Sequence, residues 1–134
     1  MTEYTDNSDK MHGKKVSDRI KDRSHYSYVY KNGISHANRD LVLYILKNNS
    51  DTNRIGISVS KKVGNSVVRH RVARLIRECC RLNGDRLKTG YDIVVVARAN
   101  AKGKNYFDIC RSFLHLAGLH GIEKCHEKDI NVPD

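Results

Sequence analysis

Three apolar runs along the chain have the patterns of β-strands. Residues 41–46 (LVLYIL) are rich in aromatic and β-branched side chains, which predicts a strand with at least one buried face. Residues 55–60 (IGISVS) alternate strictly between apolar and small side chains, the pattern of a half-buried strand. Residues 92–97 (DIVVVA) are apolar on both faces, which indicates a strand in the centre of a sheet.

One helix is expected at each end of this set of strands. Asp22 or Ser24 is a suitable N-cap for a short helix that carries residues 25–31, and the Asn32-Gly33 pair is suited to end it. Residues 106–119 predict a closing helix whose apolar side chains share one stripe. We expect that stripe to contain Phe107, Cys110, Phe113, Leu114 and Ala117.

A longer helix is predicted from Ser66 to Leu82, ending near Asn83-Gly84. At about 100° per residue its apolar side chains gather on one side. These are Val68, Val72, Leu75, Ile76, Cys79 and Leu82. The opposite side carries His70 together with Arg71, Arg74, Arg77 and Arg81. The pattern predicts a helix that packs one face on a core and presents a cationic face to a partner.

Together these elements predict an α+β domain with the order helix–strand–strand–strand–helix–strand–helix. We expect a small four-stranded sheet packed with helices in two layers. A chain of 134 residues has the length of one domain, which we place at residues 14–120. Residues 1–13 are small, polar and acidic, so they are expected to be a disordered extension. Residues 121–134 are expected to be a flexible tail.

The net charge of the chain narrows the choice of partner. Lys and Arg number 25 against 15 Asp and Glu, which gives a formal charge of +10 and a pI of about 9.6. Such an excess favours a polyanion, with nucleic acid ahead of an anionic membrane surface. No apolar run approaches the roughly 18–20 residues of a membrane span. The polar, acidic start of the chain is unlike a signal peptide. We expect a cytoplasmic protein without a membrane partner.

The four cysteines do not indicate a disulfide framework or a metal site. Cys79 and Cys80 are adjacent, which is not the C-x-x-C spacing of zinc or redox sites. A metal-binding interpretation uses Cys110, His115, His120, Cys125 and His126, whose spacings match no familiar ligand pattern. We therefore expect free thiols and no metal held by the protein.

Cationic side chains are concentrated in residues 61–81. Seven Lys and Arg lie there against the single acid Glu78, which has i,i+4 spacing for a pair with Arg74. A solvated helix face usually mixes both signs of charge. Arginine without an acidic partner is suited to phosphate, since its planar guanidinium donates two hydrogen bonds to one oxyanion. The segment predicts contact with nucleic acid.

The turn before the long helix adds a second candidate anion site. Gly64 permits a tight strand-to-helix connection, and Asn65 or Ser66 is a suitable N-cap. Lys61 and Lys62 flank the free N–H groups of the first helical turn, where anions bind. The alternative is an ordinary capped turn with exposed lysines. The phosphate-loop motif of nucleotide hydrolases does not occur, so nucleotide hydrolysis is unsupported.

Residues 61–78 (KKVGNSVVRHRVARLIRE) resemble the signature K-K-x-G-N-A-V-x-R-N-R-x-K-R-x-x-R-E of the bacterial ribonuclease P protein family. Residues 26–33 (YSYVYKNG) resemble its F-x-x-V-[FY]-K-x-G, and residues 54–60 (RIGISVS) resemble its R-x-G-[LIF]-[ST]-V-[ST]. The similarity extends over about residues 15–119 and includes residues 37–44 and 91–98.

The resemblance implies the accessory protein subunit of a ribonucleoprotein endonuclease. In that family a catalytic ribonuclease P RNA with bound Mg²⁺ removes the 5′ leader from precursor tRNA. The metal is thus expected on the RNA and the substrate, and the protein is expected to contain no catalytic residue. It is expected to bind both RNAs, to be a monomer when free and not to bind DNA. The family also has a left-handed strand–helix–strand crossover, which general rules do not predict.

The resemblance also places site residues on this sequence. The implied RNA-binding residues are Lys61, Lys62, Gly64, Asn65, Arg69, Arg71, Arg74 and Arg77, to which the outward helix face adds His70 and Arg81. The implied leader-binding cleft contains the aromatic residues Tyr26, Tyr30 and Tyr44, and we place Ser58 with them. Without the resemblance, single tyrosines of this kind are more typical of a core or its rim.

Two residues depart from the signature, since His70 replaces an asparagine and Ala73 replaces a lysine.

There are three alternatives to the accessory subunit. The main one is a non-catalytic RNA-binding module, such as a ribosomal or ribonucleoprotein assembly protein. A protein nuclease needs clustered carboxylates, whereas the acids here are scattered. A sequence-specific DNA regulator needs a short helix before the basic one, which here follows a strand directly.

Overall fold

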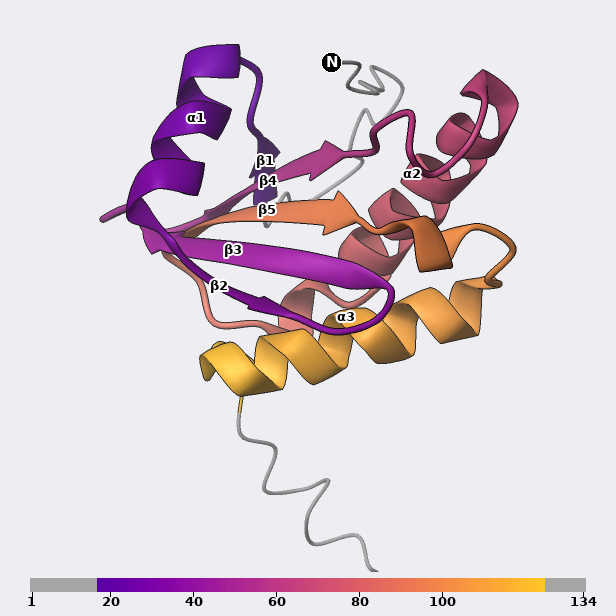
Figure 1. The fold of residues 1–134 in the computed structure, drawn as a ribbon. Coiled ribbons are helices and arrows are strands. Elements are labelled where there is room, and N and C mark those ends of the chain that lie inside the picture. Colours follow the sequence, from indigo (N-terminus) through magenta and orange to yellow (C-terminus); the bar gives the residue numbers. More distant parts are fainter. Residues whose placement is uncertain (1–16, 125–134) are drawn as a thin grey trace, which may run out of the picture.

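The three apolar runs of the sequence form the inner strands of a five-stranded sheet with the order β1-β4-β5-β3-β2 (Figure 1). The computed structural model describes residues 17–124. Its elements, in chain order, are β1 (Ser17–Arg19), α1 (Arg23–Asn32), β2 (Ile34–Ala37), β3 (Leu41–Lys47), β4 (Asn53–Ser58), α2 (Ser66–Leu82), the 3-10 turn η1 (Gly84–Arg86), β5 (Tyr91–Ala97), the 3-10 turn η2 (Ala99–Ala101) and α3 (Tyr106–His120).

The sheet has one strand more than the sequence predicted. β1 has three residues and pairs in parallel with β4, and β2 is exposed at all four positions on the opposite edge. These edge strands have no apolar alternation long enough to mark them in the sequence. β5, which is apolar on both faces, lies in the centre as predicted, parallel to β4 and antiparallel to β3.

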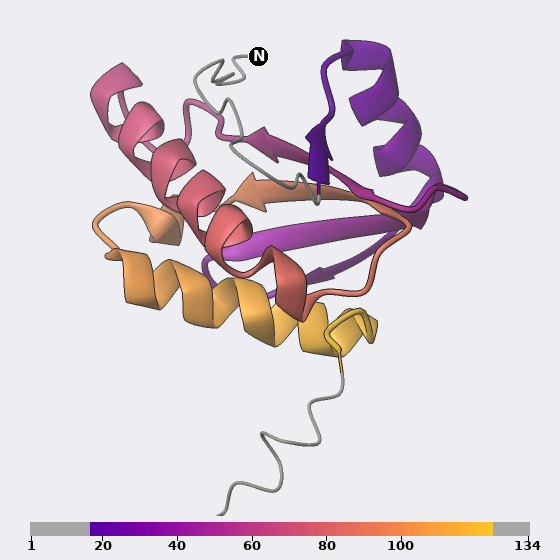
Figure 2. The ribbon, with the colours of Figure 1, turned by 180° about the vertical axis from the view of Figure 1, so that it is seen from behind.

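The connection from β4 through α2 to β5 is left-handed. The two strands are adjacent and parallel, and α2 crosses the face of the sheet that Figure 2 shows in front. When that view is turned so that the strands point upwards, β5 lies to the left of β4. Nearly all such crossovers are right-handed. The structure therefore confirms an expectation that came from the family resemblance alone.

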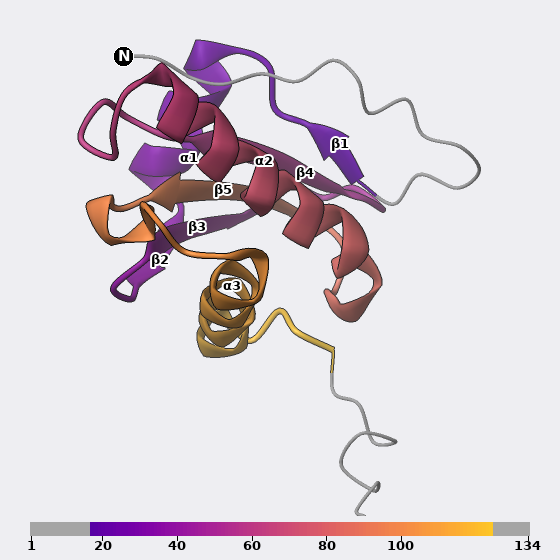
Figure 3. The same cartoon turned by 90° about the vertical axis from the view of Figure 1, so that its right-hand side faces the viewer.

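Helices lie on both faces of the sheet, so α1 adds a partial third layer to the two that were predicted. α2 and α3 cover one face over a large apolar core that includes Leu43, Ile76 and Phe113. α1 packs against β3 and β5 on the other face. Figure 3 shows α3 nearly end-on, with α2 crossing the view. The cluster of buried residues under α1 is small: Ile20, Tyr26, Val29 and Val94.

α2 begins and ends where the sequence predicted. The side chain of Asn65 caps it by accepting a hydrogen bond from the N–H of Val68 at 3.0 Å. Leu82 was expected on the buried side but is exposed. The sheet and α3 contact a side of the helix that includes Ala73 and Cys80 instead, and the buried residues are Val72, Ala73, Ile76, Cys79 and Cys80.

Most of the predicted stripe of α3 packs on the core, since Phe113 and Ala117 are buried and Cys110 and Leu114 are partly buried against it. The buried residues of this helix are Ile109, Phe113, Leu116 and Ala117. Phe107, which was expected among them, is 71% exposed. The helix begins with a reciprocal cap, in which the side chains of Asn105 and Asp108 each accept a hydrogen bond from the other's backbone N–H. Phe107 therefore stands on the first turn facing solvent.

The packed chain continues beyond the predicted end of the domain. Ile122 is buried, and its carbonyl accepts a hydrogen bond from the N–H of Lys88 at 2.6 Å. The N–H of Lys124 donates to the carbonyl of Arg86 at 2.8 Å. The flexible tail predicted from residue 121 thus does not begin there. The rest of that tail and the predicted extension 1–13 lie outside the described residues. Between residues 17 and 124, no helix has the length and apolarity to cross a membrane.

Candidate RNA-binding surfaces

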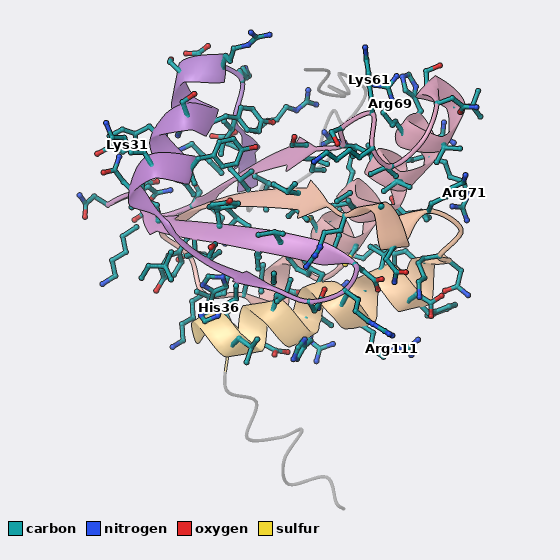
Figure 4. The ribbon with its side chains drawn as sticks, in the orientation of Figure 1. Lys31, His36, Lys61, Arg69, Arg71 and Arg111 are labelled. Atoms are coloured by element: carbon teal, nitrogen blue, oxygen red, sulfur yellow. The ribbon has the colours of Figure 1, made fainter. Side chains whose placement is uncertain are left out.

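The turn between β4 and α2 holds two lysines outward by burying residues on either side of them. Val59 and Val63 lie in the large core. Ser60 closes the turn, because its carbonyl accepts from the N–H of Val63 and its hydroxyl accepts from the N–H of Lys62. Lys61 and Lys62 are exposed. In Figure 4, Lys61 projects from the same end of the molecule as Arg69, near the start of α2.

Gly64 is required by close packing at the start of α2. A Cβ at this position would lie 2.8 Å from Cγ1 of Val68, a separation that real Cβ atoms do not adopt. The absence of a side chain lets the chain enter the helix directly above Val68. The signature glycine therefore positions the neighbouring lysines, and it offers no side chain of its own to a ligand.

The outward side of α2 carries the exposed residues His70, Arg71 and Arg74. Arg71 donates from Nη2 to the carbonyl of Lys104 at 3.0 Å, which links α2 to the segment before α3. Arg74 has no hydrogen bond or ion pair with another residue in the range 17–124. Arg71 and Arg74 therefore carry positive charge without an ion pair inside residues 17–124.

Arg69 lies between the outward row and the core. Its Nε and Nη1 atoms are buried and have no hydrogen-bond partner among the described residues. A buried polar atom without a partner costs about 1–3 kcal/mol, and more when it is charged. Native proteins rarely leave such atoms unsatisfied. The charge of this guanidinium is suited to an oxyanion bound beside it.

Arg77 and Arg81, like Arg71, also interact within the protein. Arg81 donates from Nη2 to Oε2 of Glu78 at 2.6 Å, and this contact raises the pKa of Arg81. The predicted pair between Glu78 and Arg74 is therefore wrong. Arg77 is half-buried, and its charge partly opposes the burial that raises the pKa of Cys80 to about 12. Uncompensated charge is thus concentrated toward the N-terminal half of α2.

The two departures from the signature lie on different sides of α2. His70 is exposed in the outward row. Ala73 is fully buried in the large core, where its small side chain lets the helix approach the sheet. Position 73 therefore lies on the packed side of α2 and outside the outward row.

The face of the sheet under α1 is arranged in cross-strand rows. Tyr44, Val94 and Gly56 form one row, and Val42, Val96 and Ser58 form the next. α1 covers the first row, because the ring of Tyr26 lies directly on Gly56. A Cβ at Gly56 would be 2.7 Å from Cε1 of that ring. Figure 1 shows α1 over one end of β3 and β5, with the other end of these strands not covered by a helix on this face.

Tyr26 lies beneath the surface on which the sequence placed it. Its side chain is 4% exposed, and its hydroxyl accepts a hydrogen bond from the N–H of Ile57 at 3.2 Å. A ring held in this way has no free face for a base. Tyr26 therefore supports the predicted leader-binding surface from below and joins α1 to β4.

Tyr30 and Tyr44 are half-buried at the edge of the area that α1 covers. Their ring centroids are 4.9 Å apart in an edge-on arrangement, and Tyr30 also lies 6.4 Å from Tyr26. Ser58 is buried in the next row of the sheet, beside Val96. The structure thus brings Tyr30, Tyr44 and Ser58 to one face, at the boundary between α1 and the uncovered strands.

A buried carboxylate under α1 was not predicted from the sequence. Asp92 of β5 is 4% exposed, and its oxygens lie 2.6 Å from Nε2 of His25, 3.0 Å from Nδ2 of Asn48 and 3.0 Å from Nε of Arg54. Burial raises the pKa of Asp92, but the hydrogen bonds from Asn48 and His25 and the charge of Arg54 outweigh it. The pKa therefore lies below its ordinary value. The only signal in the sequence was an acid at the start of an apolar strand.

The cysteines and histidines considered as metal ligands are separated in the structure. Sγ of Cys110 lies 3.1 Å from Sγ of Cys79, between α3 and α2. His115 and His120 contact Asn38 and the carbonyl of Leu43 instead. Within the described range, no group of three or more His, Cys, Asp or Glu is arranged to hold a metal ion. Cys125 and His126 lie outside that range.

The fold has a left-handed crossover, with a cationic helix over one face of the sheet and a pair of tyrosines on the other face. These features define an RNA-binding α+β protein. Residues 15–119 match the family model described as Ribonuclease P, and the chain belongs to that family. Its function is that of the protein component of ribonuclease P, an endoribonuclease of tRNA processing that also contains an RNA. The alternative of a ribosomal or assembly protein is not favoured.

Relatives in sequence agree over nearly their whole length. The ribonuclease P protein component of Lachnoclostridium phytofermentans is 55% identical over 116 residues, which cover 87% of this chain and 100% of that protein. The component from Clostridium acetobutylicum is 51% identical over 114 residues, covering 84% of this chain and 96% of that protein.

Solved structures agree with the fold. The RNase P protein of Staphylococcus aureus superposes with a TM-score of 0.73 at 37% identity, covering 79% of this chain and 97% of that one. The protein from Thermotoga maritima superposes with a TM-score of 0.70 at 29% identity, covering 75% of this chain and 94% of that one. These similarities confirm the family expected from the signature.

Proposed function

We propose that the two surfaces of this subunit bind different RNAs. The outward side of α2 and the turn before it bind the catalytic RNA of ribonuclease P. The observation that supports this most strongly is Arg69, whose buried Nε and Nη1 have no hydrogen-bond partner among the described residues. Exposed side chains extend the surface on both sides of it: the cations Lys61, Lys62, Arg71 and Arg74, and the imidazole of His70. The buried residues around them fix the backbone that carries these groups, which limits the entropy lost on binding.

The face that carries Tyr30 and Tyr44 binds the single-stranded 5′ leader of precursor tRNA on this proposal. Their rings meet edge-on at 4.9 Å beside the uncovered row of the sheet. Aromatic rings bind unpaired bases by stacking, worth about 1–3 kcal/mol per base. Since mature tRNA has no leader, contact at this face would favour the precursor over the product.

Catalysis is assigned to the RNA partner. Mg²⁺ would be bound by that RNA and by substrate phosphates, where it activates the attacking water and stabilises the leaving oxygen. The side chains of this protein bind and orient the two RNAs. We propose that the free protein is a monomer and acts in the cytoplasm, without a membrane or DNA partner.

One solved relative makes activity of the protein alone a necessary control. A mutant of the Staphylococcus aureus RNase P protein is described as having defective mRNA degradation activity. That protein superposes on this one with a TM-score of 0.72 at 38% identity. For this chain we expect no RNA cleavage without the catalytic RNA, and the protein-only reaction is therefore measured on both tRNA and mRNA substrates.

Reconstitution tests the proposal. The chain is combined with a bacterial ribonuclease P RNA and 5′-labelled precursor tRNA, at a Mg²⁺ concentration where the RNA alone is slow. We expect faster leader release with the protein, and less stimulation with Arg69→Ala. Arg111→Ala is the matched control, because Arg111 pairs with Asp108 on α3 (Figure 4). Equal rates with and without the wild-type protein would contradict the proposed function.

A further inference from the structure

We infer that His25 is a positioning residue for leader recognition, which holds α1 through Asp92 so that Tyr30 meets Tyr44 at the leader-binding face. This inference rests on the proposed binding of the leader to that face. His25 lies on the first turns of α1, and Asp92 lies at the start of β5. Nε2 of His25 is 2.6 Å from Oδ2 of Asp92, which is a short contact to a buried carboxylate.

α1 has little apolar contact to hold it on the sheet. The cluster beneath it has four buried residues within the described range, and the helix contributes only Tyr26 and Val29 to it. Asp22 at the N-cap makes no side-chain capping bond, and the first turn contains no acid. Capping and first-turn acids are the usual local stabilisers of a helix start. Contacts from the first turns to the sheet therefore have an unusually large part in fixing this helix.

The contact of His25 fixes the helix at the point from which the tyrosines are placed. Tyr26 follows His25 directly and occupies the space above Gly56. Tyr30 is four residues further, so it lies on the same side of the helix one turn later. Its ring then meets Tyr44, which is opposite Val94, two residues after Asp92 on β5. A shift of α1 at His25 would therefore change the edge-on contact between Tyr30 and Tyr44.

Loss of His25 removes the donor to Oδ2 of Asp92 and should leave the donors to Oδ1 in place. Asp92 keeps two donors from the sheet region, Nδ2 of Asn48 and Nε of Arg54, each at 3.0 Å. Both reach Oδ1, whereas His25 reaches Oδ2. The two oxygens thus serve different purposes, one within the sheet and one toward α1. This separation makes a test possible that distinguishes positioning from general stability.

Four variants give that test. His25→Gln keeps an N–H donor at about the reach of Nε2, while His25→Asn has a donor that is too short to reach Asp92. Ser24→Asn is the control for an asparagine on the exposed part of the same turn. Asn48→Ala is the control for stability, because it removes a donor to Asp92 without touching α1.

The measurement is the ratio of affinities for precursor and mature tRNA, using holoenzyme reconstituted with each variant and a ribonuclease P RNA. We expect His25→Asn to lower the ratio roughly fivefold, the lower end of the effect of losing one stacked base. Ser24→Asn, Asn48→Ala and the conservative His25→Gln should keep the wild-type ratio. Hydrogen exchange should quicken in α1 and not in α2 for His25→Asn alone.

Two results would overturn the inference while leaving the proposed function in place. One is a wild-type ratio in His25→Asn, and the other is an equal fall in Asn48→Ala, which would show that general stability sets the ratio. If the wild-type holoenzyme itself does not prefer precursor over mature tRNA, the proposed leader binding fails and the inference fails with it.

Discussion

The two faces of the sheet hold their helices by different means. Within residues 17–124, 21 buried residues form the core under α2 and α3, whereas four form the cluster under α1. The smaller face instead uses polar contacts, from His25 to Asp92 and from Ile57 to Tyr26. The large core fixes the backbone of α2, which carries the cations. The small one leaves tyrosines and a row of the sheet near solvent, and binding sites are commonly drawn from such less stable regions.

The largest effect is expected from the same substitution made on each face. Ile76 and Ile20 are both almost fully buried, the first in the large core and the second under α1. Replacing a buried isoleucine by alanine costs about 2–5 kcal/mol in the free energy of unfolding, depending on how well the site collapses. We expect Ile76→Ala near the upper limit and Ile20→Ala near the lower one, measured by urea unfolding. Equal losses of unfolding free energy in the two variants would contradict the proposed difference in packing between the two faces.

The next largest effect concerns the cations that the large core holds. Each phosphate contact contributes about 0.9 to the log–log slope of RNA affinity against salt for duplexes and about 0.7 for single strands. Replacing both Arg69 and Arg74 with alanine should therefore lower the slope for the catalytic RNA by about 1.4–1.8. Arg86→Ala is the control, since Arg86 pairs with Glu123 at the far end of α2. An unchanged slope in the double variant would remove these arginines from the contact surface.

The third effect is a loss of affinity for precursor tRNA when a tyrosine of the other face is replaced. Tyr44→Ala should reduce the affinity for precursor tRNA by about 1–3 kcal/mol, the value of one stacked base, and leave the affinity for mature tRNA unchanged. Tyr28 is the matched control, because it is 60% exposed on α1 away from the ring pair. If both affinities fall together in Tyr44→Ala, or if Tyr28→Ala has the same effect, the leader does not bind at this face.

The buried carboxylate of the small face gives an expected pH dependence. Although burial raises it, the pKa of Asp92 is lowered overall by its hydrogen bonds and by Arg54. Its contribution to stability is therefore complete above the unfolded value of about 3.9 and is lost as the pH falls through the folded value. Thermal unfolding between pH 6 and pH 2 should show a flatter acid limb in Asp92→Asn. Asp85→Asn, at an exposed position, should keep the wild-type profile.

The smallest effect is expected at the end of the cationic row, where Glu78 pairs with Arg81. Both side chains are about half exposed, so the pair contributes little to stability. Glu78→Gln should change the melting temperature by no more than about 2 °C and raise the affinity for catalytic RNA by up to about threefold. Glu123→Gln, which also frees an arginine, should leave RNA affinity unchanged. A fall in affinity in Glu78→Gln would mean that the acid itself is needed at the interface.

Features set by local sequence were predicted correctly. The limits of α2 follow from the capping residue Asn65 and from the helical spacing of its apolar residues. The central position of β5 follows from apolar residues on both of its faces. Pairings between distant residues were not predicted. The contact of His25 with Asp92 spans 67 positions, and the burial of Tyr26 depends on Gly56 lying below it. Neither has a local signal.

Some errors came from the choice among neighbouring partners. Glu78 has spacing for pairs with both Arg74 and Arg81, and only the packed structure selects the second. Phe107 fits the same apolar stripe of α3 as Phe113, but it lies on the first turn and is exposed, whereas Phe113 is buried. The left-handed crossover runs against the general rule, so the family resemblance was the only guide to it.

The division of labour between the faces can be tested most directly by photocrosslinking in the reconstituted holoenzyme with precursor tRNA. One variant has p-benzoylphenylalanine in place of Tyr44, and the other has it in place of Val67, which is 76% exposed on the first turn of α2. We expect the probe at Tyr44 to crosslink to nucleotides of the 5′ leader and the probe at Val67 to crosslink to the catalytic RNA. Crosslinks from both positions to the same RNA would contradict the account.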